Sequence, residues 1–162
     1  MKGLRLFEKT KIRSEIIRYG SEGYLLSGVF KMEIKHNVVG WFEIPVSDMQ
    51  RAVNFYNRLF DFELEAKPFW ETDEMAIFPT DFEKFLPGAA GALYKGKDAK
   101  PGDTGPILFF TSPSGDCQNE LDRAKEIGAN ILTEKTKIPE EHGFFIMLID
   151  SEGNKIAVHS LE

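Results

Sequence analysis

The chain has few of the features that mark several large protein classes. Cys117 is the single cysteine among 162 residues, so no internal disulfide can form, which suits a reducing compartment and leads us to expect a cytoplasmic protein. No apolar run approaches the length of a membrane-spanning helix, and we expect no membrane partner. Glycine-rich nucleotide motifs, a GxSxG motif and a cysteine-rich zinc pattern are all absent from the sequence, which therefore gives no support to nucleotide binding or to a serine hydrolase.

Basic residues are outnumbered by acidic ones, 20 to 26. The net charge is −6 and the isoelectric point is near 5.2, whereas a nucleic-acid binder needs a basic face, so we expect no nucleic-acid partner. The exception is the segment 1–31, which is locally basic and has no continuous apolar stretch typical of a secretory signal. We interpret it as a peripheral extension of unknown role or an artefact of start assignment, with a functional basic arm as the alternative.

Hydrophobic patterning along the first half predicts a strand, a helix and three further strands. The helix follows a cap at Ser47 or Asp48 and has apolar residues at the spacing of one helical face. These residues are Ala52, Phe55, Tyr56, Leu59 and Phe60. The predicted strands are residues 37–46, 62–66, 74–78 and 91–95.

The second half repeats this order after a polar linker at residues 96–105, which is rich in Gly and Pro. A strand at 106–111 leads into a helix for which Gly128 is a suitable residue just past the C-terminal end. Cys117 would lie in the first turn of this helix, either as a small structural residue or as a catalytic thiol. Three more strands are predicted at 130–133, 144–149 and 155–159.

The two halves overlay in pattern at an offset of 68 residues, which aligns Asp48 with Asp116. The predicted fold is therefore α+β, with two βαβββ modules at residues 37–95 and 106–160. The chain closes on a hairpin whose turn is Asp-Ser-Glu-Gly-Asn at residues 150–154, where Gly153 and Asn154 can take a positive φ.

Particular segments within this pattern resemble a known family. Residues 42–56, FEIPVSDMQRAVNFY, resemble the opening of a vicinal oxygen chelate domain. Residues 91–93, 129–131 and 150–154 are similar to the glyoxalase-like branch of that superfamily, which includes glyoxalase I, bleomycin-resistance proteins and extradiol dioxygenases. The resemblance covers about residues 37–160 and implies modules that curl into an open, cup-like mixed sheet, often in a homodimer.

The resemblance also implies where a metal would bind. In metal-dependent members, His, Gln or Glu side chains on inward strand positions hold a divalent ion that acts as a Lewis acid. The corresponding positions here are Trp41, Ala157, Pro106 or Phe109, and the stretch 92–94. None supplies the expected ligand, so we predict no metal or other cofactor at the usual site and no straightforward glyoxalase I or extradiol dioxygenase activity.

Strand alternation indicates which residues face the cup instead. If Trp41 and Ala157 face it, so do Glu43 and His159, because side chains at i and i+2 share a face. Glu43 and His159 are candidates for general acid/base catalysis, for orienting a bound ligand, or for a structural pair that ties the modules together. A displaced metal site is a weaker interpretation, since two donors hold a metal poorly.

The leading hypothesis is thus a metal-independent glyoxalase-like protein that binds a small, partly apolar molecule, either to sequester it or to transform it. The residues expected to line the pocket are Trp41, Trp70, Tyr94, Phe109 and Ala157. One alternative is a lyase, isomerase or dioxygenase relative with displaced metal ligands. Another is a non-catalytic dimeric interaction module whose cup is filled by its own side chains.

Overall fold

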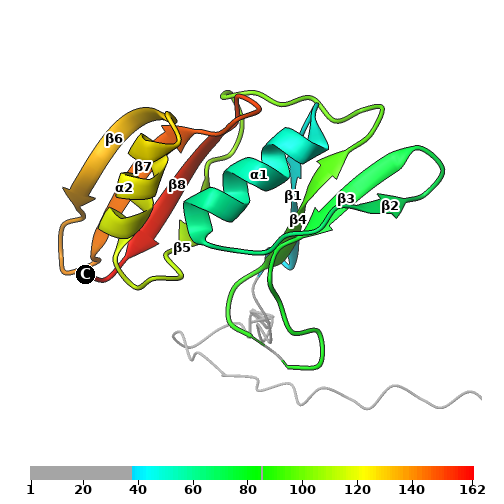
Figure 1. Cartoon of the computed structure of the whole chain (residues 1–162). Helices are drawn as coiled ribbons and strands as arrows, with labels where there is room; N and C mark the ends of the chain where they lie inside the picture. Colours follow the sequence, from blue (N-terminus) through cyan, green and yellow to red (C-terminus); the bar gives the residue numbers. More distant parts are fainter. Residues whose placement is uncertain (1–37, 85) are drawn as a thin grey trace, which may run out of the picture. The chain divides into compact units, whose positions relative to one another are not determined.

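The computed structural model describes residues 38–84 and 86–162, so the basic segment 1–31 lies outside the described residues. The elements follow one another in the order strand, helix and three strands, twice (Figure 1). They are β1 (Trp41–Pro45), α1 (Met49–Phe60), β2 (Lys67–Phe69), β3 (Asp73–Ile77), β4 (Ala90–Lys95), β5 (Leu108–Thr111), α2 (Cys117–Glu126), β6 (Asn130–Lys137), β7 (Phe144–Ile149) and β8 (Lys155–Ser160). The two-module α+β fold predicted from the sequence is confirmed.

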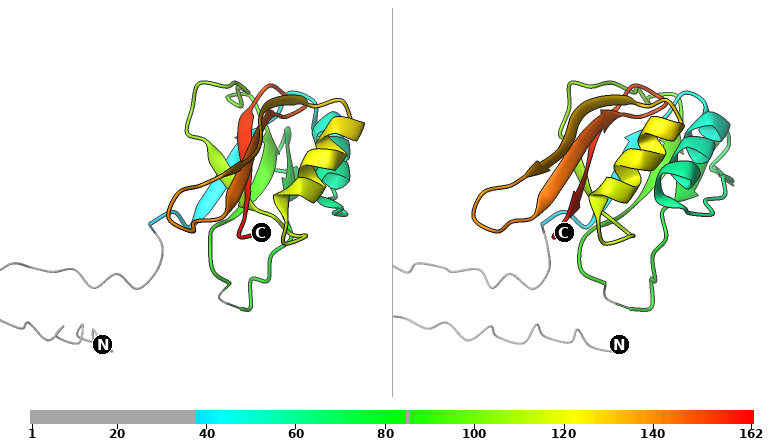
Figure 2. Two further views of the ribbon diagram at one scale, coloured as in Figure 1. Left: turned by 90° about the vertical axis from the view of Figure 1, so that its left-hand side faces the viewer. Right: turned by 60° about the vertical axis from the view of Figure 1, so that its left-hand side comes forward.

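Each module forms its own four-stranded mixed sheet. The strand orders are β1-β4-β3-β2 and β5-β8-β7-β6. In each sheet the first and last strands of the module pair in parallel, β1 with β4 and β5 with β8, while the other pairs are antiparallel. Both helices lie on the same side of the two sheets (Figure 2). Each sheet therefore has a helix-covered face and an opposite face, which we call the open face.

The aligned residues Asp48 and Asp116 cap the two helices. The Asp48 carboxylate accepts a hydrogen bond from the Arg51 amide at 3.0 Å, and the Asp116 carboxylate accepts one from the Gln118 amide at 2.8 Å. Such bonds satisfy backbone donors that have no partner within the helix. After α2, Gly128 takes a φ of +73°, as expected for a residue just past a helix end.

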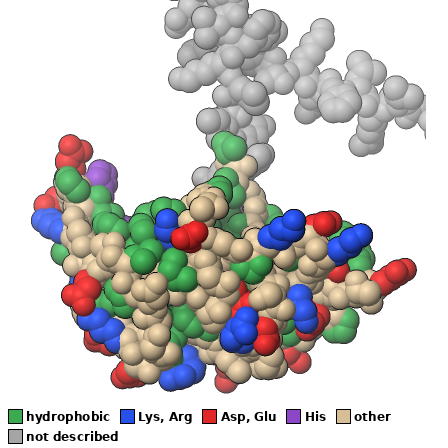
Figure 3. All heavy atoms as spheres, turned by 90° about the horizontal axis from the view of Figure 1, so that it is seen from above, with side chains coloured by type: hydrophobic (Ala, Val, Ile, Leu, Met, Phe, Trp, Pro, Cys, Tyr) green, Lys and Arg blue, Asp and Glu red, His purple; other side chains and the backbone are tan. Residues whose placement is uncertain are grey.

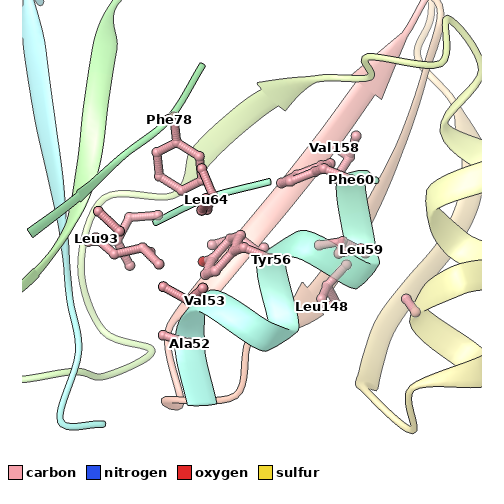
Figure 4. Packing of buried hydrophobic residues seen from close by; sticks show 14 of the residues in the cluster. Ala52, Val53, Tyr56, Leu59, Phe60, Leu64, Phe78, Leu93, Leu148 and Val158 are labelled. Atoms are coloured by element: carbon pink, nitrogen blue, oxygen red, sulfur yellow. The ribbon is translucent and has the colours of Figure 1, made fainter. Parts of the chain in front are cut away.

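The helix-covered faces share one aromatic core. The rings of Phe42 on β1 and Phe110 on β5 lie 6.0 Å apart and almost perpendicular. Tyr56 and Phe60 of α1 pack around Phe110 together with Phe78, and Figure 4 shows Phe78 reaching this cluster from outside the helix. The contact between Phe42 and Phe110 joins the first strands of the two modules through their side chains on the helix side.

One predicted strand is wrong. Residues 62–66 form no strand, and β2 begins only at Lys67. The reason is the side chain of Asn57 in α1, which accepts a hydrogen bond from the Leu64 amide at 2.7 Å and donates one to the Leu64 carbonyl at 3.3 Å. These bonds tie the segment to the helix instead of a neighbouring strand. In the second module, β6 extends to Lys137, beyond the predicted end at residue 133.

The turn between β7 and β8 joins the two modules through Glu152. Its buried carboxylate accepts hydrogen bonds from the amides of Ser47 and Asp48, both at 3.0 Å, and from the Ser47 hydroxyl at 2.7 Å. Arg51 donates from Nε at 2.7 Å and from Nη2 at 2.9 Å. A residue of the second module thus binds the first turn of the first module's helix.

Two further side chains of the same turn complete this connection. Asp150 accepts a hydrogen bond from the buried Tyr56 hydroxyl at 2.8 Å, and Asn154 donates from Nδ2 to the Pro45 carbonyl at 3.0 Å. Gly153 takes the positive φ that the sequence predicted, at 94°, whereas Asn154 contributes through its side-chain amide. The end of β1 therefore lies against the start of β8, and β1 runs opposite to β8 and β5 (Figure 1).

Candidate ligand-binding site

In each module, an equivalent backbone hydrogen bond lies at the end of the parallel strand pair. The Val46 amide donates to the Tyr94 carbonyl at 2.9 Å, and the Ser112 amide donates to the His159 carbonyl at 2.8 Å. Val46 therefore corresponds to Ser112, and Tyr94 corresponds to His159. This correspondence relates the two sheets position by position. A constant offset in sequence does not, because the second module has extra residues between its first strand and its helix.

The open face of each sheet carries a row of side chains at its middle, and we call the two rows together the central row. Glu43 corresponds to Phe109 and Ala92 to Ala157, and the strand register pairs Glu43 with Ala92 and Phe109 with Ala157. Their chain neighbours Ile44, Leu93, Phe110 and Val158 belong to the helix-side core, so the row faces away from the helices. Continuing each pairing outward adds one apolar residue on each side. The central row consists of Ile77, Ala92, Glu43, Phe109, Ala157 and Met147.

Glu43 is the one charged residue in this otherwise apolar row. Phe109 is 50 % exposed and Ile77 is 43 % exposed, whereas Ala92 and Ala157 are fully covered. The Glu43 carboxylate is exposed and accepts a hydrogen bond from the Trp41 indole Nε1 at 3.3 Å. An ionised carboxylate accepts and never donates, so a polar group that meets Glu43 must be a donor. Seen from above, hydrophobic side chains are mixed with charged ones on the surface in view (Figure 3).

The positions that the resemblance assigns to metal ligands carry no suitable donors. Trp41, Ala92 and Ala157 occupy three of them, and the correspondence with Trp41 gives Ile107, in place of Pro106 or Phe109, as the fourth. An indole N–H only donates, and the other three side chains are hydrocarbon. This donor set does not fit a divalent ion. Within residues 38–84 and 86–162, no group of three His, Cys, Asp or Glu side chains is placed to hold a metal ion elsewhere.

Glu43 and His159 bond to different partners. Glu43 lies at the middle of β1, while His159 lies near the far end of β8, away from the point where Asn154 meets the end of β1. His159 Nε2 is 2.7 Å from the carbonyl oxygen of His142, in the loop between β6 and β7. His159 therefore holds this loop against β8, and Glu43 is the polar group left in the centre of the open face.

Tyr94 lies on the open side of β4 and bonds to Asp73. Its hydroxyl donates to the Asp73 carboxylate at 2.5 Å. This hydrogen bond, with lesser contributions from desolvation and from the negative charges of Asp73, Glu43 and Asp98, raises the pKa of Tyr94 to about 12. Three carboxylates thus act on one hydroxyl, and this part of the first sheet is negatively charged.

Trp70 lies at the tip of the hairpin between β2 and β3. It is 78 % exposed, has a φ of 52°, and its ring lies 4.6 Å from that of Phe69. It borders a shallow depression that is also lined by Glu71, Thr72 and Asp73. Asp73 connects this depression to Tyr94 on the open face. Trp70 is therefore at the periphery of the site, two strands away from Glu43.

Sequence reasoning missed Ile77 and Met147, which complete the central row. Alternation within a strand assigns a face, but the pairing of Ile77 with Ala92 and of Met147 with Ala157 depends on strand register. The apolar character of both segments was the available signal. It could not tell which residue lies level with Glu43.

A comparison with models of protein families shows to which family the chain belongs. The family model described as the Glyoxalase/Bleomycin resistance protein/Dioxygenase superfamily matches residues 38–158. The chain belongs to this superfamily. The resemblance drawn from the sequence is confirmed. A search of curated proteins finds no match.

Solved structures with this fold include an antibiotic binding protein, a fosfomycin resistance protein and a glyoxalase I mutant. TnmS3, an antibiotic binding protein from Streptomyces sp. CB03234, is 24 % identical with a TM-score of 0.55, over 80 % of this chain and 98 % of that one. FosX, a fosfomycin resistance protein from Listeria monocytogenes, is 16 % identical with a TM-score of 0.53, over 79 % and 92 %. A glyoxalase I mutant from Zea mays is 16 % identical with a TM-score of 0.57, over 75 % and 45 %. At these identities the likeness shows a shared fold.

Neither helix of the described part is long and apolar enough to cross a membrane.

Proposed function

We propose that this protein binds a small, partly apolar molecule on its open face, without a metal ion at the ligand positions usual in its superfamily. The observation that carries the proposal is the central row, which holds one carboxylate among apolar side chains, two of which, Ile77 and Phe109, are substantially exposed. Pockets for small ligands typically combine an apolar lining with a few placed polar groups. The four metal-ligand positions carry Trp41, Ala92, Ile107 and Ala157, which supports binding without a metal.

The neighbours in fold support a small-molecule ligand of this general kind. Among them are an antibiotic binding protein and a fosfomycin resistance protein. Binding would serve to sequester the ligand or to transform it. In the second case Glu43 would act as a general base, because it is the carboxylate at the centre of the row. The homodimer and the cytoplasmic location remain predictions. Light scattering tests the homodimer.

A thermal-shift screen of metabolites and divalent metals tests the proposal, because a ligand that binds the native state raises its stability. We expect a shift with an organic ligand in the presence of chelator, and its loss in Phe109→Ala. The exposed Glu126→Gln on α2 is the matched control. Metal analysis of protein purified without chelator is the second arm. A stoichiometric divalent ion that disappears in Glu43→Gln or His159→Ala would overturn the proposal in favour of a metal-dependent enzyme with displaced ligands.

The remaining alternative is a dimeric interaction module whose open face is covered by protein. Light scattering of Phe109→Ala and Trp41→Ala distinguishes it. If both variants dissociate a dimer and no small molecule shifts the unfolding temperature, the open face is a protein interface and the ligand proposal fails.

A further inference from the structure

We propose that the tip of the β2–β3 hairpin binds an arginine side chain of a basic partner protein, with the guanidinium group stacked on Trp70 and hydrogen-bonded to Asp73. Both residues line the same shallow depression. β2 is the outer strand of the first sheet, and its hairpin lies on the side of the molecule away from the second sheet (Figure 1). The site is thus separate from the central row and goes beyond the function proposed above.

The ring of Trp70 is supported on one side and free on the other. It is 78 % exposed, and the ring of half-buried Phe69 lies against it with centroids 4.6 Å apart and planes inclined by 32°. Trp70 also has a φ of 52°, which a bulky residue rarely adopts. Phe69 therefore holds the indole in position, and the face of the ring turned away from Phe69 is open to a ligand.

Asp73 provides a carboxylate of fixed orientation in the same depression. Its Oδ2 accepts a hydrogen bond from the Tyr94 hydroxyl at 2.5 Å, and its Oδ1 accepts one from the Thr72 hydroxyl at 3.3 Å. Each oxygen of an ionised carboxylate can accept more than one hydrogen bond, so both can still bind a further donor. Two hydroxyls thus orient the group without neutralising its charge.

The carboxylates that line the depression have no basic partner. Lys95 on the adjacent strand β4 is engaged with Glu74 at 2.6 Å. In the described part of the chain, no ion pair involves Glu71 or Asp73. A cation from another molecule would therefore not have to displace one that is already bound.

The surroundings of the depression are acidic as well. Residues 61–74 contain six carboxylates and one lysine, Lys67, which pairs with Glu65 at 3.4 Å. Such a concentration of negative charge attracts a basic segment and repels an acidic one.

The corresponding hairpin of the second module lacks this combination. Its loop between β6 and β7, residues 138–143, contains no Phe, Trp or Tyr, and Glu141 in that loop is paired with Lys137 at 3.3 Å. The exposed ring beside carboxylates without a basic partner is therefore a feature of the first module alone.

A guanidinium group matches these features better than an ammonium group does. It is planar, so it stacks on an aromatic face, and it can donate two parallel hydrogen bonds to one carboxylate. A lysine ammonium is a compact point charge and lacks this planar geometry.

A protein is a better source of the guanidinium than a free metabolite. The depression is shallow and is lined by four successive residues, 70–73. Small-molecule sites, in contrast, bury about 70–90 % of the surface of their ligand. A side chain carried by a polypeptide gains further contact from the acidic surface around the depression.

Three fluorescein-labelled peptides test the chemistry in anisotropy titrations of the full chain. Each alternates glycine with three positions that hold arginine, lysine or citrulline; citrulline is planar but uncharged, whereas lysine is charged but not planar. We expect the arginine peptide to bind about three- to tenfold more tightly than the lysine peptide, because only the guanidinium combines stacking with paired hydrogen bonds. The citrulline peptide should not bind. Equal binding of the arginine and lysine peptides, or no binding of either, would overturn the proposal.

Variants locate the arginine peptide. Trp70→Ala should weaken its binding about three- to tenfold through loss of the cation–π contact. Asp73→Asn should weaken it about tenfold or more, because hydrogen bonds to charged groups are the stronger ones. Glu141→Gln removes one negative charge from the hairpin loop of the second module and is the matched control, which should bind like the wild type. Equal losses in Asp73→Asn and Glu141→Gln would mean that only the overall charge matters, and the proposal fails. If thermal unfolding shows that Asp73→Asn is not folded, Glu71→Gln takes its place.

Fluorescence and light scattering give two further readouts. Trp41→Phe leaves Trp70 as the remaining tryptophan of the two in the chain. We expect the arginine peptide to change the emission of Trp70, because it covers an exposed ring; unchanged emission at saturation places the peptide elsewhere and refutes the proposal. Dissociation of a dimer in Trp70→Ala would show that a second copy of the chain covers the ring, which also contradicts it.

Discussion

The two faces of the sheets differ in how their polar and aromatic side chains are satisfied. On the helix-covered side, Tyr56 is buried, and the carboxylates of Asp150 and Glu152 in the turn between β7 and β8 are buried too; each is hydrogen-bonded across the two modules. On the open face, Trp41 and Phe109 are substantially exposed. The helix-covered face thus holds the fold together, and the open face is available for a ligand. Substitutions should therefore separate stability from binding, and four predictions test this.

The largest effect on stability is expected from Glu152→Ala. This change removes the acceptor for Arg51, for the Ser47 hydroxyl and for two amides at the start of α1. Loss of one partner of a buried ion pair typically costs about 3–5 kcal/mol, and we expect about 3 kcal/mol because Arg51 remains half exposed to water. Urea unfolding measures it. The exposed Glu126→Ala should change the free energy of unfolding by less than about 0.5 kcal/mol; a comparable loss there would remove the distinction.

The same residue should make stability depend on pH in the acid range. Burial raises the pKa of Glu152, but hydrogen bonds from Arg51, Ser47 and Asp48 outweigh it and lower the pKa to about 2 from its usual 4.5. Because the folded value is depressed, the stabilisation is complete above pH 4.5 and is lost as the pH falls from 4.5 to 2. This shift corresponds to about 3 kcal/mol.

The difference in unfolding free energy between wild type and Glu152→Gln should therefore shrink across that pH interval. The two proteins are compared by urea unfolding at each pH, so that contributions from other carboxyl groups cancel. A difference that stays constant from pH 6 to pH 2.5 would show that Glu152 is not stabilised by these bonds.

The contrast between local signals and long-range contacts explains which features could be predicted from the sequence. The closing turn and the helix caps could be predicted because their signals are local: Asp48 and Asp116 each precede an apolar helical pattern, and Gly153 is placed to take a positive φ. The absence of ligands at Trp41 and Ala157 was also readable, since it depends on residue type alone. The partners of Glu152 and Asp150 lie about a hundred residues away, so nothing local indicated that the turn joins the modules.

The wrong prediction of a strand at residues 62–66 and the limits of the site prediction have a related cause. Residues 62–66 have the composition of a strand, yet one side chain, Asn57, bonds to the backbone of Leu64 and competes with strand pairing. For the site, alternation placed Glu43 and His159 on one face, but only the structure shows that Glu43 bonds to Trp41 and His159 to the His142 carbonyl. Direction and register between modules are tertiary properties that periodicity does not contain.

A smaller effect on stability is expected from Tyr56→Phe. The Tyr56 hydroxyl donates to Asp150, and burial, followed by the charge of Asp150, raises the pKa of Tyr56 well above its ordinary value. Loss of this hydroxyl leaves a buried carboxylate with one donor fewer, which should cost about 1–2 kcal/mol in urea unfolding. Tyr94→Phe, which removes a hydroxyl from the half-exposed open face, should cost less. The reverse order would mean that the open face contributes more to stability than its exposure indicates.

The smallest effect on stability is expected from Phe109→Ala on the open face. Full truncation of a buried phenylalanine costs about 3–5 kcal/mol, but half of this ring is already in contact with water and no cavity closes over it. We expect a loss below about 1.5 kcal/mol, measured beside Phe110→Ala, the adjacent residue that packs in the helix-side aromatic core and should cost at least twice as much. Ligand binding should follow the opposite order, because Phe109→Ala removes a contact surface while the fold persists. If Phe109→Ala destabilises the protein as much as Phe110→Ala does, the ring is a structural element of the second sheet, and the separation of stability and binding between the two faces does not hold.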